Sequence, residues 1–204
     1  MTIVRCWNPP AFHANNRSSD DFSGEDMVYN PRRIRERRLD AARGYLLLEM
    51  PQPALAELAQ IQDPGPQKFE FHLLKGECFR ALKRHEEALS EFEEAHHLHP
   101  SDLDVLMGMA WCFKRTSQLL RAIDTMHSAY ASHAEEPVVL YNLSCYYALV
   151  GQREQALSWL GRALRMNREL LKLVPDETDF DPIREDAEFR LLIHLAASSK
   201  SAAK

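Results

Sequence analysis

Glycine is scarce in this sequence, with only 7 residues in 204, and none of them forms a motif that binds phosphate. The Gly-x-Ser-x-Gly elbow of hydrolases and the His-Glu-x-x-His motif of zinc proteases are also missing. No apolar run is long enough to cross a membrane, and no apolar core of a secretory signal follows Met1. These absences predict a cytoplasmic protein that is not an enzyme and that uses no cofactor or metal ion.

Cysteine is also rare, and its spacing fits neither a metal site nor a redox pair. The four cysteines are Cys6, Cys78, Cys112 and Cys145, and no two of them form a Cys-x-x-Cys motif. The last three lie inside apolar helical patterns, which predicts reduced, buried thiols.

Charge of one sign does not dominate, because 25 basic and 30 acidic residues give a net charge of −5. This balance argues against nucleic acid or an anionic membrane as a partner. A run of arginines near 32–38 has no interleaved aromatic residues, so we interpret it as a solvated or partner-facing helix start. No motif indicates a small-molecule substrate.

What the sequence does contain is a repeat of 34 residues. Small residues recur at Ala42, Gly76, Ala110 and Ser144. Aromatic residues follow three positions later at Tyr45, Phe79, Phe113 and Tyr147. Two further columns hold alanine (Ala54, Ala88, Ala122, Ala156) and large apolar residues (Leu58, Phe92, Met126, Leu160). With 9% aromatic residues overall, four in one column arise by chance in roughly one case in ten thousand.

This order of residue types resembles the tetratricopeptide repeat, in which each unit is a pair of antiparallel helices. The resemblance implies an all-α fold, a right-handed solenoid of four helix pairs with a C-terminal capping helix. The tryptophan often found before the small residue is absent, and the closing proline is missing from the last two units. The four units lie near 35–68, 69–102, 103–136 and 137–170.

The chain around the repeats divides into an arm, a cap and a tail. Residues 1–30 lack periodicity and predict a flexible arm before the repeats of 31–173. A capping helix is expected within 174–196, and a disordered tail over 197–204. Acids before and within the cap are expected to face water: Asp176, Glu177, Asp179, Asp181, Glu185, Asp186 and Glu188. Helices are expected near 31–48, 52–61, 68–82, 85–97, 102–115, 119–132, 137–149, 153–173 and 182–195.

The resemblance also implies where a partner would bind. In such arrays the first helix of each pair lines a concave groove, and the fifth residue of each unit points into it. These positions form an apolar row: Leu39, Leu73, Met107 and Tyr141. Neighbouring groove positions are Arg43, Glu77, Arg80, Trp111, Lys114, Arg115, Asn142 and Cys145.

An exposed row of this kind favours an apolar or aromatic ligand, and the basic residues beside it favour some acidic character. Two alternatives remain open. Part of the row could be buried between adjacent helices, or the N-terminal arm could lie in the groove and block it.

The sequence therefore predicts an adaptor or scaffold that holds a protein or peptide partner in its groove. The alternative is a cytosolic chaperone for an apolar client, as in type III secretion, although such chaperones normally carry three units. The partner, the pathway and the oligomeric state are not predicted.

Overall fold

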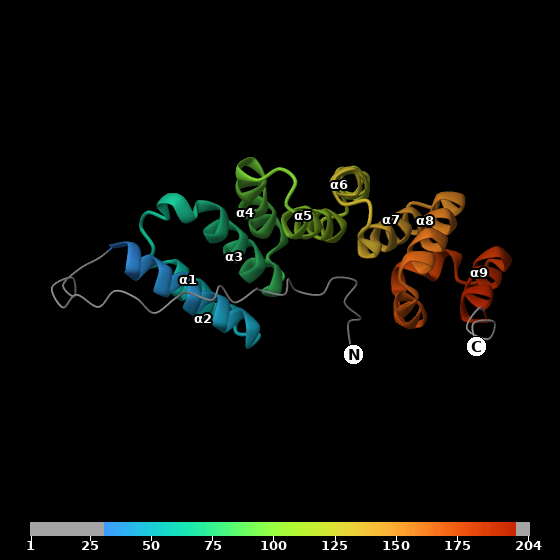
Figure 1. Ribbon diagram of the computed structural model, residues 1–204, viewed down its shortest axis with the longest axis horizontal. Helices are drawn as coiled ribbons and strands as arrows, with labels where there is room; N and C mark the ends of the chain where they lie inside the picture. Colours follow the sequence, from blue (N-terminus) through green and yellow to red (C-terminus); the bar gives the residue numbers. More distant parts are fainter. Residues whose placement is uncertain (1–30, 199–204) are drawn as a thin grey trace. The chain divides into compact units, whose positions relative to one another are not determined.

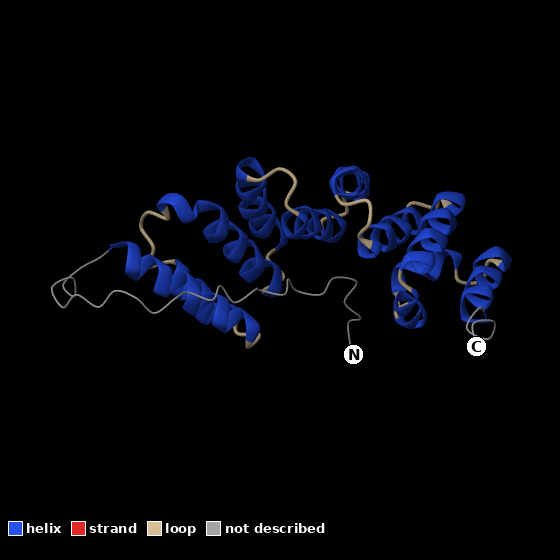
Figure 2. Cartoon of the chain, in the orientation of Figure 1, coloured by secondary structure: helices blue, strands red, loops and turns tan. Residues whose placement is uncertain are grey.

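The computed structural model describes residues 31–198. The predicted N-terminal arm, its groove-blocking hypothesis, Cys6 and the tail beyond Ser198 lie outside these residues. Within the described range every regular element is a helix (Figure 2). None of these helices combines the length and apolar character needed to cross a membrane. Residues 31–100 belong to one compact part and residues 101–198 to another, and each is described by itself.

The N-terminal part contains two helix pairs (Figure 1). Helix α1 (Pro31–Leu47) pairs with α2 (Pro51–Leu58), and α3 (Lys68–Ala81) pairs with α4 (His85–Leu98). A short 3-10 turn, η1 (Gly65–Gln67), leads into α3. Proline opens both α1 and α2, where its missing N–H costs nothing because the first helical N–H groups have no partner within the helix.

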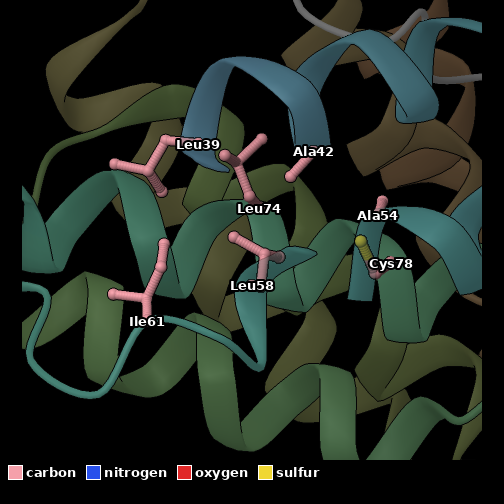
Figure 3. Packing of buried hydrophobic residues seen from close by; sticks show 7 residues of the cluster. All are labelled: Leu39, Ala42, Ala54, Leu58, Ile61, Leu74 and Cys78. Atoms are coloured by element: carbon pink, nitrogen blue, oxygen red, sulfur yellow. The ribbon is translucent and has the colours of Figure 1, made fainter. Parts of the chain in front are cut away.

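The core of the first pair confirms the repeat register in the N-terminal part. Figure 3 shows seven buried residues of this core, which come from α1, α2, α3 and the segment after α2. Ala42 and Ala54 are fully buried, as the small-residue columns require. In the second pair, a side chain on Gly76 would come within 2.7 Å of the Phe92 ring, so glycine lets these two helices pack closely.

The C-terminal part contains two further pairs. Helix α5 (Leu103–Arg115) pairs with α6 (Leu119–Ser132), and α7 (Pro137–Leu149) pairs with α8 (Arg153–Met166). Asp102 caps α5, since its carboxylate accepts a hydrogen bond from the N–H of Val105 at 3.0 Å. The alanine and large apolar columns are again fully buried here, at Ala122, Met126, Ala156 and Leu160.

One further feature recurs every 34 residues, and it is a backbone conformation and not a residue type. The turn inside each helix pair places one residue in the left-handed conformation, with φ between 57° and 75°. The N–H of the next residue then bonds to a carbonyl in the last turn of the first helix, as in Arg84 to Phe79 at 2.9 Å. The four residues are Glu49, Lys83, Ser117 and Gly151.

The structure corrects the helices expected near the C-terminus. The expected helix over 153–173 ends at Met166, because Asn167 is extended and its side chain accepts a bond from the N–H of Glu169. Three short 3-10 turns follow: η2 (Arg168–Lys172), η3 (Val174–Asp176) and η4 (Thr178–Ile183).

The last α-helix, α9, spans Ala187–Ser198 and so begins five residues later than expected. Asp186 precedes it and accepts bonds from the N–H groups of Glu188 and Phe189, which fixes this start. The expectation that all the nearby acids face water is also wrong. Glu177 and Asp179 are buried, with exposed fractions of 5% and 7%.

Candidate peptide-binding surface

The predicted groove residues of the N-terminal part are mostly buried or paired with one another. Leu39 and Leu73 have exposed fractions of 2% and 8%, so the expected exposed row is not present here. Leu39 belongs to the core that α1 shares with α2, in line with the alternative that part of the row is buried.

The charged groove residues of this part have oppositely charged neighbours. Arg43 forms ion pairs with Asp40 and with Glu70. Arg80 donates two hydrogen bonds to a single oxygen of Glu77, at 2.6 and 3.1 Å. Glu77 is itself buried, which its pairing with a guanidinium makes tolerable.

The remaining seven predicted residues lie on α5 and α7 in the C-terminal part. We call them the A-helix surface: Met107, Trp111, Lys114, Arg115, Tyr141, Asn142 and Cys145. Their burial differs from the expectation, because Met107 has an exposed fraction of 4% and Tyr141 of 0%. The apolar row is therefore covered rather than open.

The cover over Tyr141 is a segment of the same chain. Turn η4 packs against α7. The rings of Phe180 and Tyr141 lie edge to face, with 5.7 Å between their centroids and 84° between their planes. Phe180 is fully buried and also contacts Phe189 of α9 at 5.4 Å. Edge-to-face contacts of this kind are a favoured arrangement of aromatic rings.

A charge contact lies beside this aromatic contact. Lys114 Nζ of α5 lies 2.6 Å from Asp179 Oδ2 of η4. Burial acts to lower the pKa of Lys114, but the Asp179 carboxylate, together with smaller contributions from Cys145 and Glu177, raises that pKa above its ordinary value. The lysine therefore stays charged on the buried side of this surface.

Cys145, Glu177 and Asp179 bring three ligand atoms within 4.8 Å of one another, an arrangement that could hold a metal ion. Lys114 already supplies a positive charge to this cluster, through its contact with Asp179. Glu177 also has a local role, since its carboxylate accepts a hydrogen bond from the N–H of Asp179 at 3.1 Å. These contacts account for the two carboxylates of the cluster, so we assign no metal to it.

The part of the A-helix surface beyond η4 is more open. Trp111 is half-buried, and the exposed Arg115 guanidinium stacks on its ring at 5.5 Å. Asn142 is buried and donates to the carbonyl of Val138 at 2.8 Å, one turn earlier on α7. Asn142 Nδ2 also lies 3.9 Å from Sδ of Met107, so this side chain links α7 to α5, whereas Trp111 is partly exposed and Arg115 is exposed.

Sequence reasoning missed the residues that cover the surface: Glu177, Asp179 and Phe180. A usable signal was present, because the groove positions predict an aromatic and acidic ligand and Asp179-Phe180 has that chemistry. Two surface depressions elsewhere flank α9 and contain none of the predicted groove residues.

Comparison with protein-family models finds no match, and comparison with curated proteins finds none either. Solved structures do match. A fragment of MamA from Desulfovibrio magneticus RS-1 aligns with a TM-score of 0.64 and 16% identity, covering 84% of this chain and 98% of that one. PilF of Pseudomonas aeruginosa aligns with a TM-score of 0.61 and 18% identity, covering 81% and 78%.

A thermophilic TPR protein of Thermus thermophilus aligns with a TM-score of 0.60 and 20% identity, covering 76% of this chain and 84% of that one. At such identities the likeness shows the fold and not the function. Together with the repeat columns and the helix pairs, it confirms the predicted class. The chain has the tetratricopeptide-repeat fold, an all-α solenoid type built from helix pairs.

Proposed function

We propose that this chain is a non-catalytic interaction scaffold that binds a partner peptide on the A-helix surface of α5 and α7. The observation that supports the proposal is the contact of Lys114 and Tyr141 with Asp179 and Phe180. Through these two residues the surface can hold a short peptide segment by one carboxylate and one aromatic ring. Trp111 and Arg115 extend it with an accessible aromatic and a cation.

The adaptor is favoured over a chaperone for an apolar client. A chaperone needs a broad exposed apolar surface, and the apolar row that the sequence predicts is buried at all four positions. A cytoplasmic location, and the lack of nucleic-acid, membrane or small-molecule partners, remain predictions of the sequence.

Affinity capture from native lysate tests the proposal. The bait is the full chain, compared with the double variant Trp111→Ala/Arg115→Glu, which changes one half-buried and one exposed residue and none of the fully buried ones. Arg165→Glu on α8 is the matched control, because it makes the same charge reversal at an exposed position of the second helix of a pair. Circular dichroism must first show that all three baits are folded.

We expect the wild-type and Arg165→Glu chains to retain the same partner and the double variant to lose it. If all three baits retain the same proteins, the working surface lies elsewhere and the proposal is wrong.

A further inference from the structure

We propose that residues 177–183, the cis segment, occupy the partner site of the A-helix surface, and that the partner presents an acidic residue followed directly by an aromatic one. This inference rests on the proposed function and deepens it. It specifies the residue types that the partner presents, and it means that the cis segment competes with the partner for the same surface.

The charge contact carries the first step. Lys114 and Asp179 are both largely buried, and they meet at 2.6 Å. A segment that only needed to cap the last repeat would be served at least as well by apolar side chains, because desolvating an ion pair offsets most of its attraction. A buried pair does, however, discriminate strongly, since an occupant without the carboxylate leaves Lys114 charged and unpartnered.

The aromatic contact carries the second step. Phe180 follows Asp179 directly, so a single dipeptide supplies both contacts to the surface. Its ring is fully buried against Tyr141, which is fully buried as well. Tyr141 and Lys114 therefore define two neighbouring subsites, one for a ring and one for a carboxylate.

The third observation concerns the backbone of the cis segment, which hydrogen-bonds to residues close to it in the sequence. The N–H of Phe180 donates to the carbonyl of Glu177, and Arg184 donates to the carbonyls of Glu177 and Pro175, at 2.6 and 3.2 Å. The segment thus keeps its turns through local bonds while its side chains reach the A-helix surface. A partner would have to replace side-chain contacts, chiefly those of Asp179 and Phe180, and would not have to break a backbone ladder.

Tethering then sets the strength of the competition. The cis segment is joined at both ends to ordered elements, η3 and α9, so its effective concentration is at least the millimolar value of a short flexible tether. A free peptide of equal affinity therefore competes poorly until the cis segment is weakened. A natural partner must offer additional contacts, and Trp111 and Arg115 lie on the same helix as Lys114 to provide them.

The test measures binding of a fluorescent peptide with the sequence of residues 174–184, VPDETDFDPIR, to the full chain by anisotropy. The receptors are wild type, Phe180→Ala, which weakens the cis segment, and Thr178→Ala, a control at an exposed position of η4. A control peptide replaces the residues equivalent to Asp179 and Phe180 by Asn and Ala.

We expect the peptide to bind Phe180→Ala at least about tenfold more tightly than it binds wild type or Thr178→Ala, because the cis competitor is impaired. The control peptide should bind none of them. If a folded Phe180→Ala chain binds the two peptides equally weakly, the segment is a structural cap and the inference is overturned.

Hydrogen exchange on the wild-type chain covers the case in which Phe180→Ala does not fold. Peptide titrated well above the effective concentration of the tethered segment should speed amide exchange in residues 177–183 and leave α7 and α8 unchanged. No change in 177–183 at the highest concentration would overturn the inference. Failure here is separable from failure of the proposed function. A partner captured through Trp111 and Arg115 but not displaced by the peptide would leave the proposed function standing alone.

Discussion

At Gly76 the ring of Phe92 leaves no room for a side chain, since an added Cβ would lie 2.7 Å from two ring carbons. Phe92 is fully buried and cannot move aside cheaply. The sequence predicts this close approach from the column of small residues, and the structure supplies the atom that enforces it.

Gly76→Ala should therefore destabilise the N-terminal part, because overpacking a core typically costs about 1–3 kcal/mol, which outweighs the better helix propensity of alanine. Gly44→Ala in α1 is the matched control, with nothing within 4 Å of its new Cβ. This control variant should have a free energy of unfolding about 0.5–1 kcal/mol higher than that of wild type. Thermal melts of both variants check the prediction, and shifts of the same sign would contradict it.

The thiol of Cys78 should be inert in the folded chain. Burial, followed by the nearby Glu77 carboxylate, raises the pKa of Cys78 to about 12. At pH 8 only about one thiol in ten thousand would be a thiolate, the reactive form.

Alkylation followed by mass spectrometry checks this in a Cys6→Ser background, which removes the cysteine outside the described residues. We expect Cys78, and the equally buried Cys112 and Cys145, to react only after denaturant is added. Rapid labelling of Cys78 in the native chain would show that its surroundings are wrongly described.

Asp104 lies in the first turn of α5, where a negative charge is normally favourable. Here burial, and next the neighbouring Asp102, raise the pKa of Asp104 to about 6. The folded state then binds this proton more tightly than the unfolded chain, whose pKa is near 3.8. Ionisation of Asp104 thus lowers the free energy of unfolding. The whole of this loss is present above pH 6, and none of it remains below about pH 4.

Asp104→Asn should raise the melting temperature relative to wild type at pH 7.5, and the difference should shrink as the pH falls through 6 towards 4. Glu135→Gln, at an exposed position, serves as the control and should show no such trend. A rise in melting temperature of Asp104→Asn that stays constant with pH would rule out this electrostatic explanation.

At the scale of elements, the turn inside each helix pair is the feature that the sequence shows least. Glu49, Lys83, Ser117 and Gly151 share a left-handed backbone at 34-residue spacing, although only one of them is glycine. Their side chains share no property, so no residue column reveals the conformation. The hydrogen bonds that close each turn stabilise it in spite of the strain.

Gly151→Ala should lower the stability of the C-terminal part by about 1 kcal/mol, because an alanine in this conformation is strained even with open space around it. Gly161→Ala, inside α8 and with ordinary contacts at 3.5 Å, should lose nothing or gain slightly. Urea denaturation of both variants gives the comparison. Equal behaviour of the two glycines would argue against the left-handed turn.

At the scale of the whole molecule, the repeat could be predicted because one physical requirement recurs at a fixed spacing. Ala54, Ala88, Ala122 and Ala156 are all fully buried in their helix pairs. The first seven helices were predicted to within three residues at either end for the same reason, since each apolar face has a neighbour to pack against.

The sequence predicts the residues of the A-helix surface as a candidate site, but it does not predict that another segment of the chain covers them. Lys114, Tyr141 and Cys145 come together on α5 and α7, as the resemblance implies. Their covering by Asp179 and Phe180 could not be predicted, because it occurs once and not in every repeat. The sequence pattern predicts a continuous helix over 153–173, which Asn167 in fact ends, and it does not indicate on which surface the chain beyond Asn167 lies.

The contact between Lys114 and Asp179 is therefore the feature on which the account depends most. A double-mutant cycle in the full chain, using Lys114→Met, Asp179→Leu and the combination, measures it by urea denaturation. Each single variant should lower the free energy of unfolding by about 3–5 kcal/mol, because it leaves the other charge of the pair buried without its partner. The double variant should lower it by far less than the sum of the two single losses. Strictly additive costs would mean that residues 177–183 do not lie on the A-helix surface, and the proposed site would lose its support.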